Sequence, residues 1–93
     1  MKKITNLKEA INELDKIISD EDKEYLLTDN VSHTSLLVHH SLGRWIRNNW
    51  GLWEDKSELK LNMIKLGFIH PDDMSNYIIE QFIEYLKNGN RRN

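Results

Sequence analysis

Apolar residues recur at intervals of three and four along most of this chain, and no other feature of the sequence constrains the fold as strongly. This spacing places apolar side chains on one face of an α-helix, whereas a half-buried strand would require strict alternation. Helix start and stop signals divide the pattern into five segments, and no strand can be placed. The sequence therefore predicts an all-α protein, a compact bundle of about five short helices.

Start and stop signals set the approximate limits of these helices. Asn6 and Glu9 have capping-box spacing before the first helix, and Gly51 and Gly67 are the expected ends of the third and fourth. The helices are expected over about residues 7–18, 19–27, 32 or 34 to 49, 55–66 and 70–88. The expected core positions are Leu7, Ala10, Ile11, Leu14, Ile17, Ile18, Tyr25, Leu26, Leu27, Val38, Leu42, Trp45, Ile46, Asn49, Leu59, Met63, Ile64, Leu66, Met74, Ile78, Phe82, Tyr85 and Leu86.

Size and composition fit one globular domain. The chain has 93 residues, of which 39% are hydrophobic and 30% are charged, with a single proline. We expect one domain over residues 1–93, with a frayed polar tail over about residues 88–93. The absence of cysteine excludes disulfides and thiolate metal sites.

The charge balance and the apolar pattern also limit the function classes. A net charge of −2 argues against general nucleic-acid binding, which needs clustered cations. No apolar run approaches the length of a membrane span, and no apolar run follows the two lysines near the start, as a signal peptide would require. We expect a cytoplasmic protein without a membrane partner, and the sequence does not set its oligomeric state. The abundance of Asn, Ile and Lys is typical of AT-rich coding in a bacterium or its phage.

The segment over residues 42–53 contains all three tryptophans of the chain. Two interpretations remain open for Trp45, Trp50 and Trp53: they seal the core and the following turn, or some of them face solvent. Trp50 and Trp53 follow or end the helix, and they are the pair expected to show a face to solvent. Exposed tryptophan beside Arg44 would have the composition of an interface hot spot.

A second face of the same helix carries Leu36, His40, Gly43 and Arg47. Glycine inside a helix costs about 1 kcal/mol relative to alanine, which indicates close approach of another group. One interpretation is structural: another helix packs over Gly43, and Arg47 pairs with Asp72 or Asp73. The alternative is an anion or peptide site, in which His40, Arg47 and Asn48 hold the ligand.

The motif over residues 70–75 predicts a helix start. Pro71 suits the first helical turn, and Asp72 and Asp73 complement the helix dipole. His70 or Asp72 is the expected cap, with Asp73 or Ser75 completing a capping box.

The same motif also permits weaker chemical hypotheses. His70 and Asp72 with His33, His39 and His40 allow a metal hypothesis, but no established ligand spacing is present. No nucleophile elbow or phosphate loop occurs either. No metal, cofactor or catalytic residue is therefore assigned.

These motifs together resemble a family of small bacterial proteins known only as a domain of unknown function. The shared pattern is Leu42-Gly43, Trp45-Ile46-Arg47-Asn48, Trp50 and Leu52-Trp53, followed by the motif over residues 70–75. The resemblance covers most of the chain and implies a compact all-helical domain. It directs attention to six residues, Arg47, Asn48, His70, Asp72, Asp73 and Ser75, and it brings no activity, cofactor or substrate.

The sequence favours a non-enzymatic protein that binds a macromolecular partner, as an immunity protein, inhibitor or adaptor of bacterial or phage origin. The expected contacts are Arg44, Arg47, Asn48, Trp50, Trp53 and His40. The alternative is a nucleotide- or phosphate-binding protein, or a minor phosphoester hydrolase, built on the cluster of His, Arg and Asp.

Overall fold

The computed structural model describes residues 3–28, 32–54 and 57–88, without the side chains of residues 25, 28 and 32–40. Within these ranges the chain forms five α-helices and no strand, which confirms the all-α prediction. The helices are α1 (Leu7–Ile17), α2 (Asp20–Thr28), α3 (Ser32–Asn49), α4 (Glu58–Lys65) and α5 (Pro71–Lys87). The expected tail lies outside the described residues from position 89 onward.

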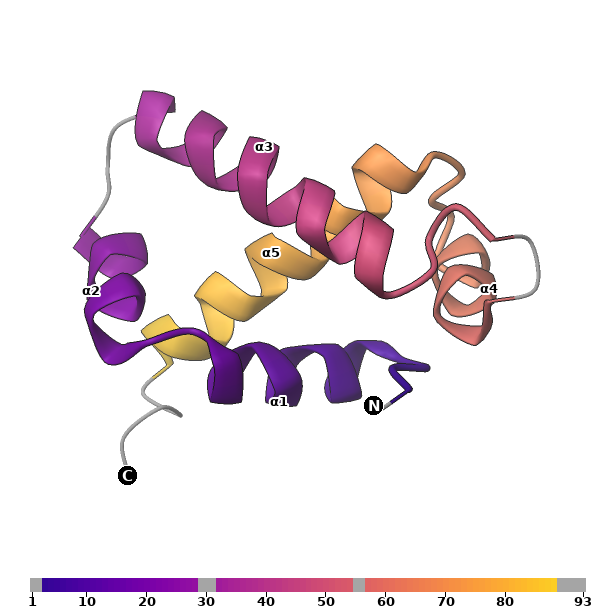
Figure 1. The fold of residues 1–93 in the computed structure, drawn as a ribbon, viewed down its shortest axis with the longest axis horizontal. Coiled ribbons are helices and arrows are strands. Elements are labelled where there is room, and N and C mark those ends of the chain that lie inside the picture. The colour runs from indigo at the N-terminus through magenta and orange to yellow at the C-terminus, as the bar shows by residue number, and fades with distance from the viewer. Residues whose placement is uncertain (1–2, 29–31, 55–56, 89–93) are drawn as a thin grey trace.

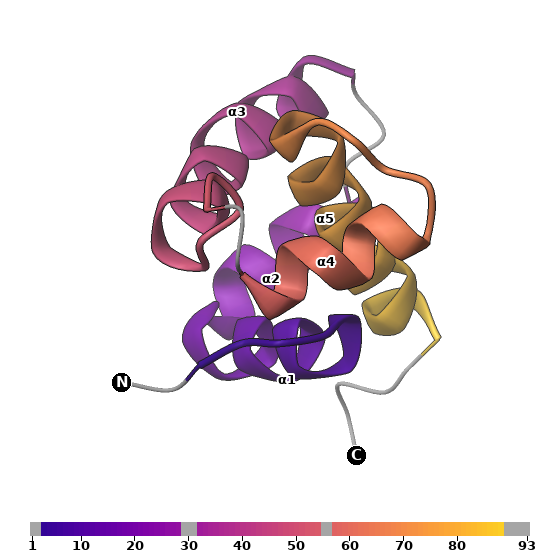
Figure 2. The ribbon, with the colours of Figure 1, turned by 90° about the vertical axis from the view of Figure 1, so that its right-hand side faces the viewer.

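Helix α5 is the centre of the bundle. It contacts each of the other four helices, and α3 most extensively. In Figure 1 it runs between α3 and α1, and Figure 2 shows α4 lying against it. Its fully buried apolar side chains, Met74, Ile78, Ile79 and Phe82, meet Ala10 and Leu14 of α1, Ile46 of α3 and Leu59 and Met63 of α4 in one core.

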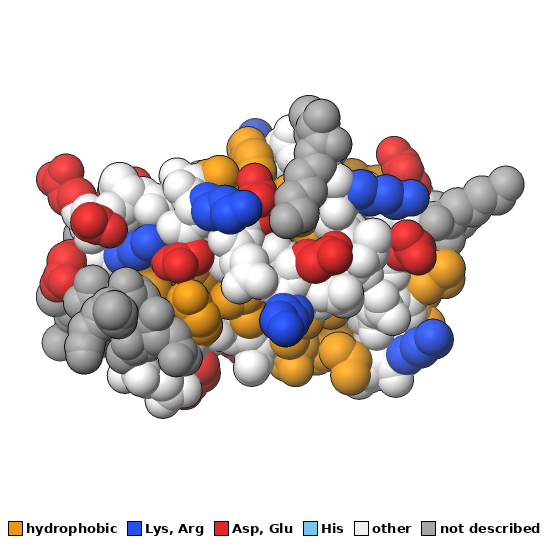
Figure 3. Space-filling view, turned by 90° about the horizontal axis from the view of Figure 1, so that it is seen from below, with side chains coloured by type: hydrophobic (Ala, Val, Ile, Leu, Met, Phe, Trp, Pro, Cys, Tyr) orange, Lys and Arg blue, Asp and Glu red, His pale blue; other side chains and the backbone are white. Residues whose placement is uncertain are grey.

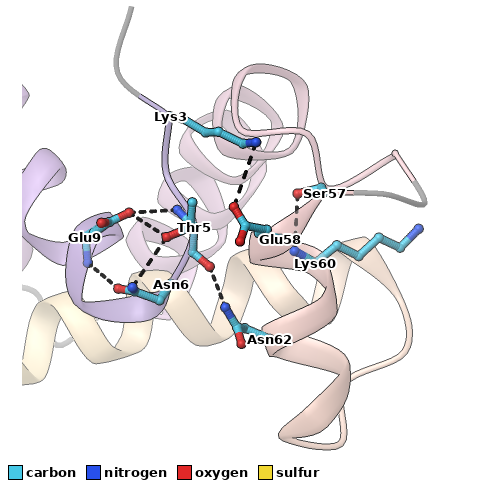
Figure 4. A network of polar contacts seen from close by, with 8 residues as sticks. All are labelled: Lys3, Thr5, Asn6, Glu9, Ser57, Glu58, Lys60 and Asn62. Carbon is cyan, nitrogen blue, oxygen red and sulfur yellow. Dashed lines mark hydrogen bonds and ion pairs between the residues drawn. The ribbon is translucent and has the colours of Figure 1, made fainter.

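The start of α1 carries a variant of the expected capping box. Asn6 Oδ1 accepts the Glu9 amide at 2.9 Å, as an N-cap side chain does. Glu9 Oε1 accepts from the amide and the hydroxyl of Thr5, at 2.9 and 2.8 Å, one residue earlier than a standard box. Asn62 of α4 donates a 2.6 Å hydrogen bond to the carbonyl oxygen of Thr5. The network therefore connects the residues at the start of α1 to α4 (Figure 4).

Glycine ends α3 and α4 as the sequence predicts. Gly51 and Gly67 have φ angles of 74° and 104°, a region that side-chain-bearing residues rarely adopt. After Gly67, the Phe68 amide donates to the Met63 carbonyl at 3.1 Å, and the Gly67 amide donates to the Ile64 carbonyl at 2.9 Å. These two bonds form a Schellman motif, which turns the chain out of α4 toward α5.

The core prediction is wrong for several apolar residues. Ile17, Trp45, Ile64 and Leu66 are exposed, and so is Asn49. Each lies at the edge of a helical stripe or beyond a helix end, and the neighbouring helices cover only the centre of each stripe. The surface therefore carries more large apolar side chains than the periodicity predicts.

None of the helices in the described part of the chain is long and apolar enough to cross a membrane. Figure 3 shows the side of the molecule on which α1 lies. Positive, negative and hydrophobic side chains are interspersed among the visible described residues of that side.

Candidate functional site

The C-terminal half of α3 presents two different surfaces. At 100° per residue, Gly43, Ile46 and Arg47 lie on the side that meets α5. Arg44 and Asn48 are four residues apart and lie together on the outward side. Gly43 and Ile46 are buried, whereas Arg44 and Asn48 are exposed. The packing of α3 on α5 thus divides the motif over residues 42–53 into residues that face α5 and residues that face away from it.

Arg47 fastens the inward side to the start of α5. Its Nη1 donates a 2.9 Å hydrogen bond to Ser75 Oγ, and its Nε lies 3.3 Å from Asp72 Oδ1. The Nε–H has no aligned acceptor among the described residues, so the contact with Asp72 is an ion pair rather than a directed hydrogen bond. Ser75 Oγ also donates to the Asp72 carbonyl at 3.0 Å. The expected pairing of Arg47 with an acidic residue is therefore present, with Asp72 and not with Asp73.

Gly43 gives Arg47 and Ser75 the space that they occupy. A Cβ at position 43 would lie 3.1 Å from Arg47 Nη1 and 3.2 Å from Ser75 Oγ, closer than most real Cβ contacts. The gap predicted over this glycine is thus filled by a side chain of α3 and one of α5. The side chains of Leu36 and His40, expected on the same face, lie outside the described part of α3.

The outward side forms a surface that we call the tryptophan surface, made of Arg44, Trp45, Asn48 and Trp53. Trp53 is 59% exposed and Trp45 is 40% exposed. The placement of Trp45 in the core is therefore wrong, because its position on α3 points away from α5. Trp50, expected to face solvent with Trp53, is half-buried and packs on the core.

Two contacts hold the exposed rings in fixed orientations. Trp53 Nε1 donates a 3.0 Å hydrogen bond to Asn48 Oδ1, which satisfies the indole N–H while the ring remains in solvent. Trp45 meets Trp50 edge to face, with ring centroids 5.6 Å apart and an interplanar angle of 74°. The tryptophan surface is therefore preformed.

His70 begins α5 without capping it through its side chain. It occupies the N-cap position, but its imidazole makes no capping hydrogen bond, and Pro71 is the first helical residue. The predicted capping box is wrong, because Ser75 Oγ bonds to Asp72 and Arg47 and not to a free amide of the first turn. Asp72 and Asp73 lie in that turn, where their charge complements the helix dipole.

No group of three or more potential ligands in the described part of the chain could hold a metal ion. His70 is exposed at the start of α5. The side chains of His33, His39 and His40, which the metal hypothesis required, fall outside that description.

Sequence reasoning missed a polar cluster that joins α1, α2 and α5. Lys23 is 7% exposed, and its Nζ lies 2.8 Å from both Asp15 Oδ1 and the Asp15 carbonyl oxygen. Tyr85 donates a 3.1 Å hydrogen bond to Asp15 Oδ2. Burial, then this hydrogen bond and the negative charge of Asp15, raise the pKa of Tyr85 above its usual value. No local pattern links these residues, because Lys23 lies on the next helix, eight positions after Asp15, and Tyr85 lies 70 positions after it.

A shallow groove beside this cluster is lined by Leu7, Lys8, Ile11, Asn12 and Tyr85. Its volume is about 360 Å³, and its lining is mainly apolar. None of the residues predicted for a site lies in it.

The chain belongs to a protein family described as a domain of unknown function, DUF6794, whose match spans residues 5–86. This range includes all five helices except the last residue of α5. No match was found among curated proteins or among solved structures.

Proposed function

We propose that this member of the DUF6794 family is a non-enzymatic protein that binds a protein partner through the tryptophan surface. One observation carries the proposal: two exposed tryptophans, Trp45 and Trp53, are held by contacts with Trp50 and Asn48 on the side of α3 that also carries the exposed Arg44. An immunity protein, inhibitor or adaptor acting in the bacterial cytoplasm is the specific form of the proposal.

A partner that covers the tryptophan surface gains hydrophobic free energy at a small cost in side-chain entropy. An indole ring in water exposes a large apolar area, and a partner that covers it gains hydrophobic free energy. Because Asn48 and Trp50 already fix the two rings, binding loses little side-chain entropy. Tryptophan and arginine are also the residues most enriched among binding hot spots.

The alternative ligand site has less support. It requires Arg47 to meet an anion near Gly43, but Arg47 already pairs with Asp72 and donates to Ser75. The space over Gly43 is occupied by the same side chains. An incoming anion would have to displace both contacts.

The test compares two double variants. In Arg44→Ala/Trp53→Ala the tryptophan surface loses its cation and its most exposed ring. In the control, Lys16→Ala/Ile17→Ala, a lysine and an apolar side chain that is 46% exposed are removed from α1. Both sets of side chains are exposed, so we expect both variants to keep the wild-type fold, as measured by circular dichroism and thermal melting.

Affinity capture from lysate of the source organism, with quantitative mass spectrometry, then measures partner retention. We expect the first variant to lose about tenfold or more of a captured protein, whereas the control retains it. If the folded Arg44/Trp53 variant keeps every protein that the wild type captures, the proposal is wrong.

A further inference from the structure

The tryptophan surface carries three hydrogen-bonding groups whose N–H donors have no acceptor among the described residues. The guanidinium of Arg44 makes neither an ion pair nor a hydrogen bond there, and the indole N–H of Trp45 makes no hydrogen bond. Asn48 Oδ1 accepts from the Trp53 indole at 3.0 Å, which leaves Asn48 Nδ2 free to donate. All three residues are exposed, so a partner can meet these donors.

Acceptors are scarce on the same surface. Among its four residues the only side-chain oxygen is Asn48 Oδ1, which already accepts from Trp53. The oxygens of Asn49 and Glu54 lie at its edges, and Glu54 makes no ion pair with Arg44 within the described ranges. The tryptophan surface is therefore rich in donors and poor in acceptors, and its complement is a segment rich in acceptors.

A segment in the polyproline II conformation is such a complement. Its backbone makes no internal hydrogen bonds, so its carbonyl oxygens are free to accept. Each proline also lacks an N–H, so it adds an acceptor without adding a donor. A helix uses its carbonyls internally, and a β-strand exposes N–H groups beside its carbonyls along the same edge. The donor pattern therefore favours a proline-rich segment over a helix or a strand.

The exposed rings fit the same kind of segment. Proline-rich segments bind to domains by packing their rings against aromatic side chains. Trp45 and Trp53, which are 40% and 59% exposed, offer such side chains, and contacts with Trp50 and Asn48 hold them in place. A polyproline II segment is ordered before it binds, so the contact costs little conformational entropy on either side.

Two other occupants fit the tryptophan surface less well. An isologous dimer would place the surface against itself, with donors opposite donors. An anionic membrane is typically bound through four to eight clustered cations, whereas Arg44 is the single cation of this surface. One cation is enough to select an acidic side chain next to the bound prolines.

We propose that the tryptophan surface recognises an extended, proline-rich segment of the partner protein with an Asp or Glu beside the prolines. Trp45 and Trp53 pack against the proline rings, and the free N–H groups of Trp45 and Asn48 donate to backbone carbonyls. Arg44 binds the carboxylate. This assignment rests on the function proposed above, because it specifies the partner of the same surface.

The probe is a displayed library of 12-residue peptides, randomised at every position and selected against the wild-type protein. Each enriched peptide is then tested on Arg44→Ala/Trp53→Ala and on the control Lys16→Ala/Ile17→Ala, whose side chains are also exposed. Two conservative variants separate the contacts. Trp45→Phe removes the indole N–H and keeps an aromatic ring, and Arg44→Gln removes the charge and keeps a hydrogen-bond donor.

We expect the peptides that need the tryptophan surface to be enriched in proline and in Asp or Glu. They should bind Arg44→Ala/Trp53→Ala about tenfold more weakly than wild type, and the control as tightly as wild type. Trp45→Phe should weaken binding about fivefold, as the loss of one hydrogen bond does. Arg44→Gln should remove a preference of about threefold for acidic over neutral flanks.

The two exposed indoles should also respond differently to a bound peptide in NMR spectra. The indole N–H of Trp45 gains an acceptor, so its resonance should shift more than that of Trp53, whose N–H stays bonded to Asn48. A larger shift at Trp53 than at Trp45 would contradict the proposed donor role of Trp45.

Two results would overturn the proline-rich partner and leave the proposed function intact. In the first, the peptides that depend on Arg44 and Trp53 are enriched without proline. In the second, no peptide depends on these residues, although capture from lysate yields a protein that Arg44→Ala/Trp53→Ala no longer binds. Self-association or vesicle binding that depends on Trp53, without such peptides, would assign the surface to a second copy or to lipid. Loss of both surface-dependent peptides and surface-dependent capture would overturn the proposed function as well.

Discussion

Arg47 of α3 donates a 2.9 Å hydrogen bond to Ser75 of α5, directly above a glycine on its own helix. The two residues are 28 positions apart, and the bond joins the two helices that pack most extensively. A donor that belongs to a charged group makes a stronger hydrogen bond than a neutral one. The arrangement depends on three positions, 43, 47 and 75, and can be tested at each.

Gly43→Ala should destabilise the protein, although alanine is the better helix former. A Cβ at position 43 would lie 3.2 Å from Ser75 Oγ and would disturb the bond to Arg47. We expect a net loss of about 1 kcal/mol in the free energy of unfolding, after the gain in helix propensity. Urea denaturation of the purified variant measures it.

A double-mutant cycle of Gly43→Ala with Ser75→Ala separates the loss caused by steric contact from the gain in helix propensity. Without the hydroxyl, the nearest α5 atom is Ser75 Cβ at 3.8 Å, an ordinary contact. The Arg47 Nη1 group, 3.1 Å from the added Cβ, then lacks its bond to Ser75 and is free to shift away. In that background Gly43→Ala should stabilise by up to about 1 kcal/mol. An equal loss in both backgrounds would show that the steric account is wrong.

Asp72→Asn should affect stability slightly more than Asp73→Asn. Both acids lie in the first turn of α5 and complement its dipole, but only Asp72 lies beside Arg47. Because the Asp72 side chain is mostly exposed, solvent screens the pair, and we expect a difference below about 1 kcal/mol. The difference should disappear in 1 M salt, and a difference that survives would indicate a contribution other than the ion pair.

Much of the fold was predictable because its signals are local. The cap at Asn6 and the ends at Gly51 and Gly67 depend on residues within one or two helical turns. The pairing of Arg47 with the start of α5 was one of two interpretations of the sequence, because paired charges are common at helix starts. Interactions predicted from residues at these helix ends are thus present in the folded protein.

The exposure of Trp45 shows what the sequence could not predict. A helical wheel identifies an apolar stripe, but it does not say which edge of the stripe another helix will cover. The buried Lys23 is a second case, because lysine is rarely buried and its partner Asp15 lies on another helix. Both outcomes depend on how the helices cross, and periodicity carries no information about that.

Asp15→Asn should destabilise the protein more than Lys23→Met. The first substitution would leave the buried ammonium of Lys23 with only neutral oxygens at position 15 and with the exposed carboxylate of Asp20, 3.9 Å away. The second would leave the partly solvated carboxylate of Asp15 without its cation. We expect a loss of about 2 kcal/mol for Asp15→Asn and about 1 kcal/mol for Lys23→Met. Thermal and urea unfolding of both variants measure the two losses. A larger loss for Lys23→Met than for Asp15→Asn would mean that the ammonium of Lys23 reaches water.

Tyr85 should make stability fall at alkaline pH. Its pKa in the folded protein is raised, so above about pH 10 the unfolded chain releases this proton while the folded protein keeps it. The hydrogen bond to Asp15 contributes fully below that pH, and its contribution is lost as the pH rises through the raised pKa.

Tyr85→Phe removes the titrating group and retains the ring. The variant should be less stable than wild type at pH 8, by about 1 kcal/mol for the lost hydrogen bond. Between pH 9 and 11 the difference should shrink, because only the wild type loses stability through this group. Urea denaturation across this range gives the stabilities, and absorbance at 295 nm follows the titration. A difference that stays constant with pH would show that the phenol of Tyr85 ionises alike in the folded and unfolded chains.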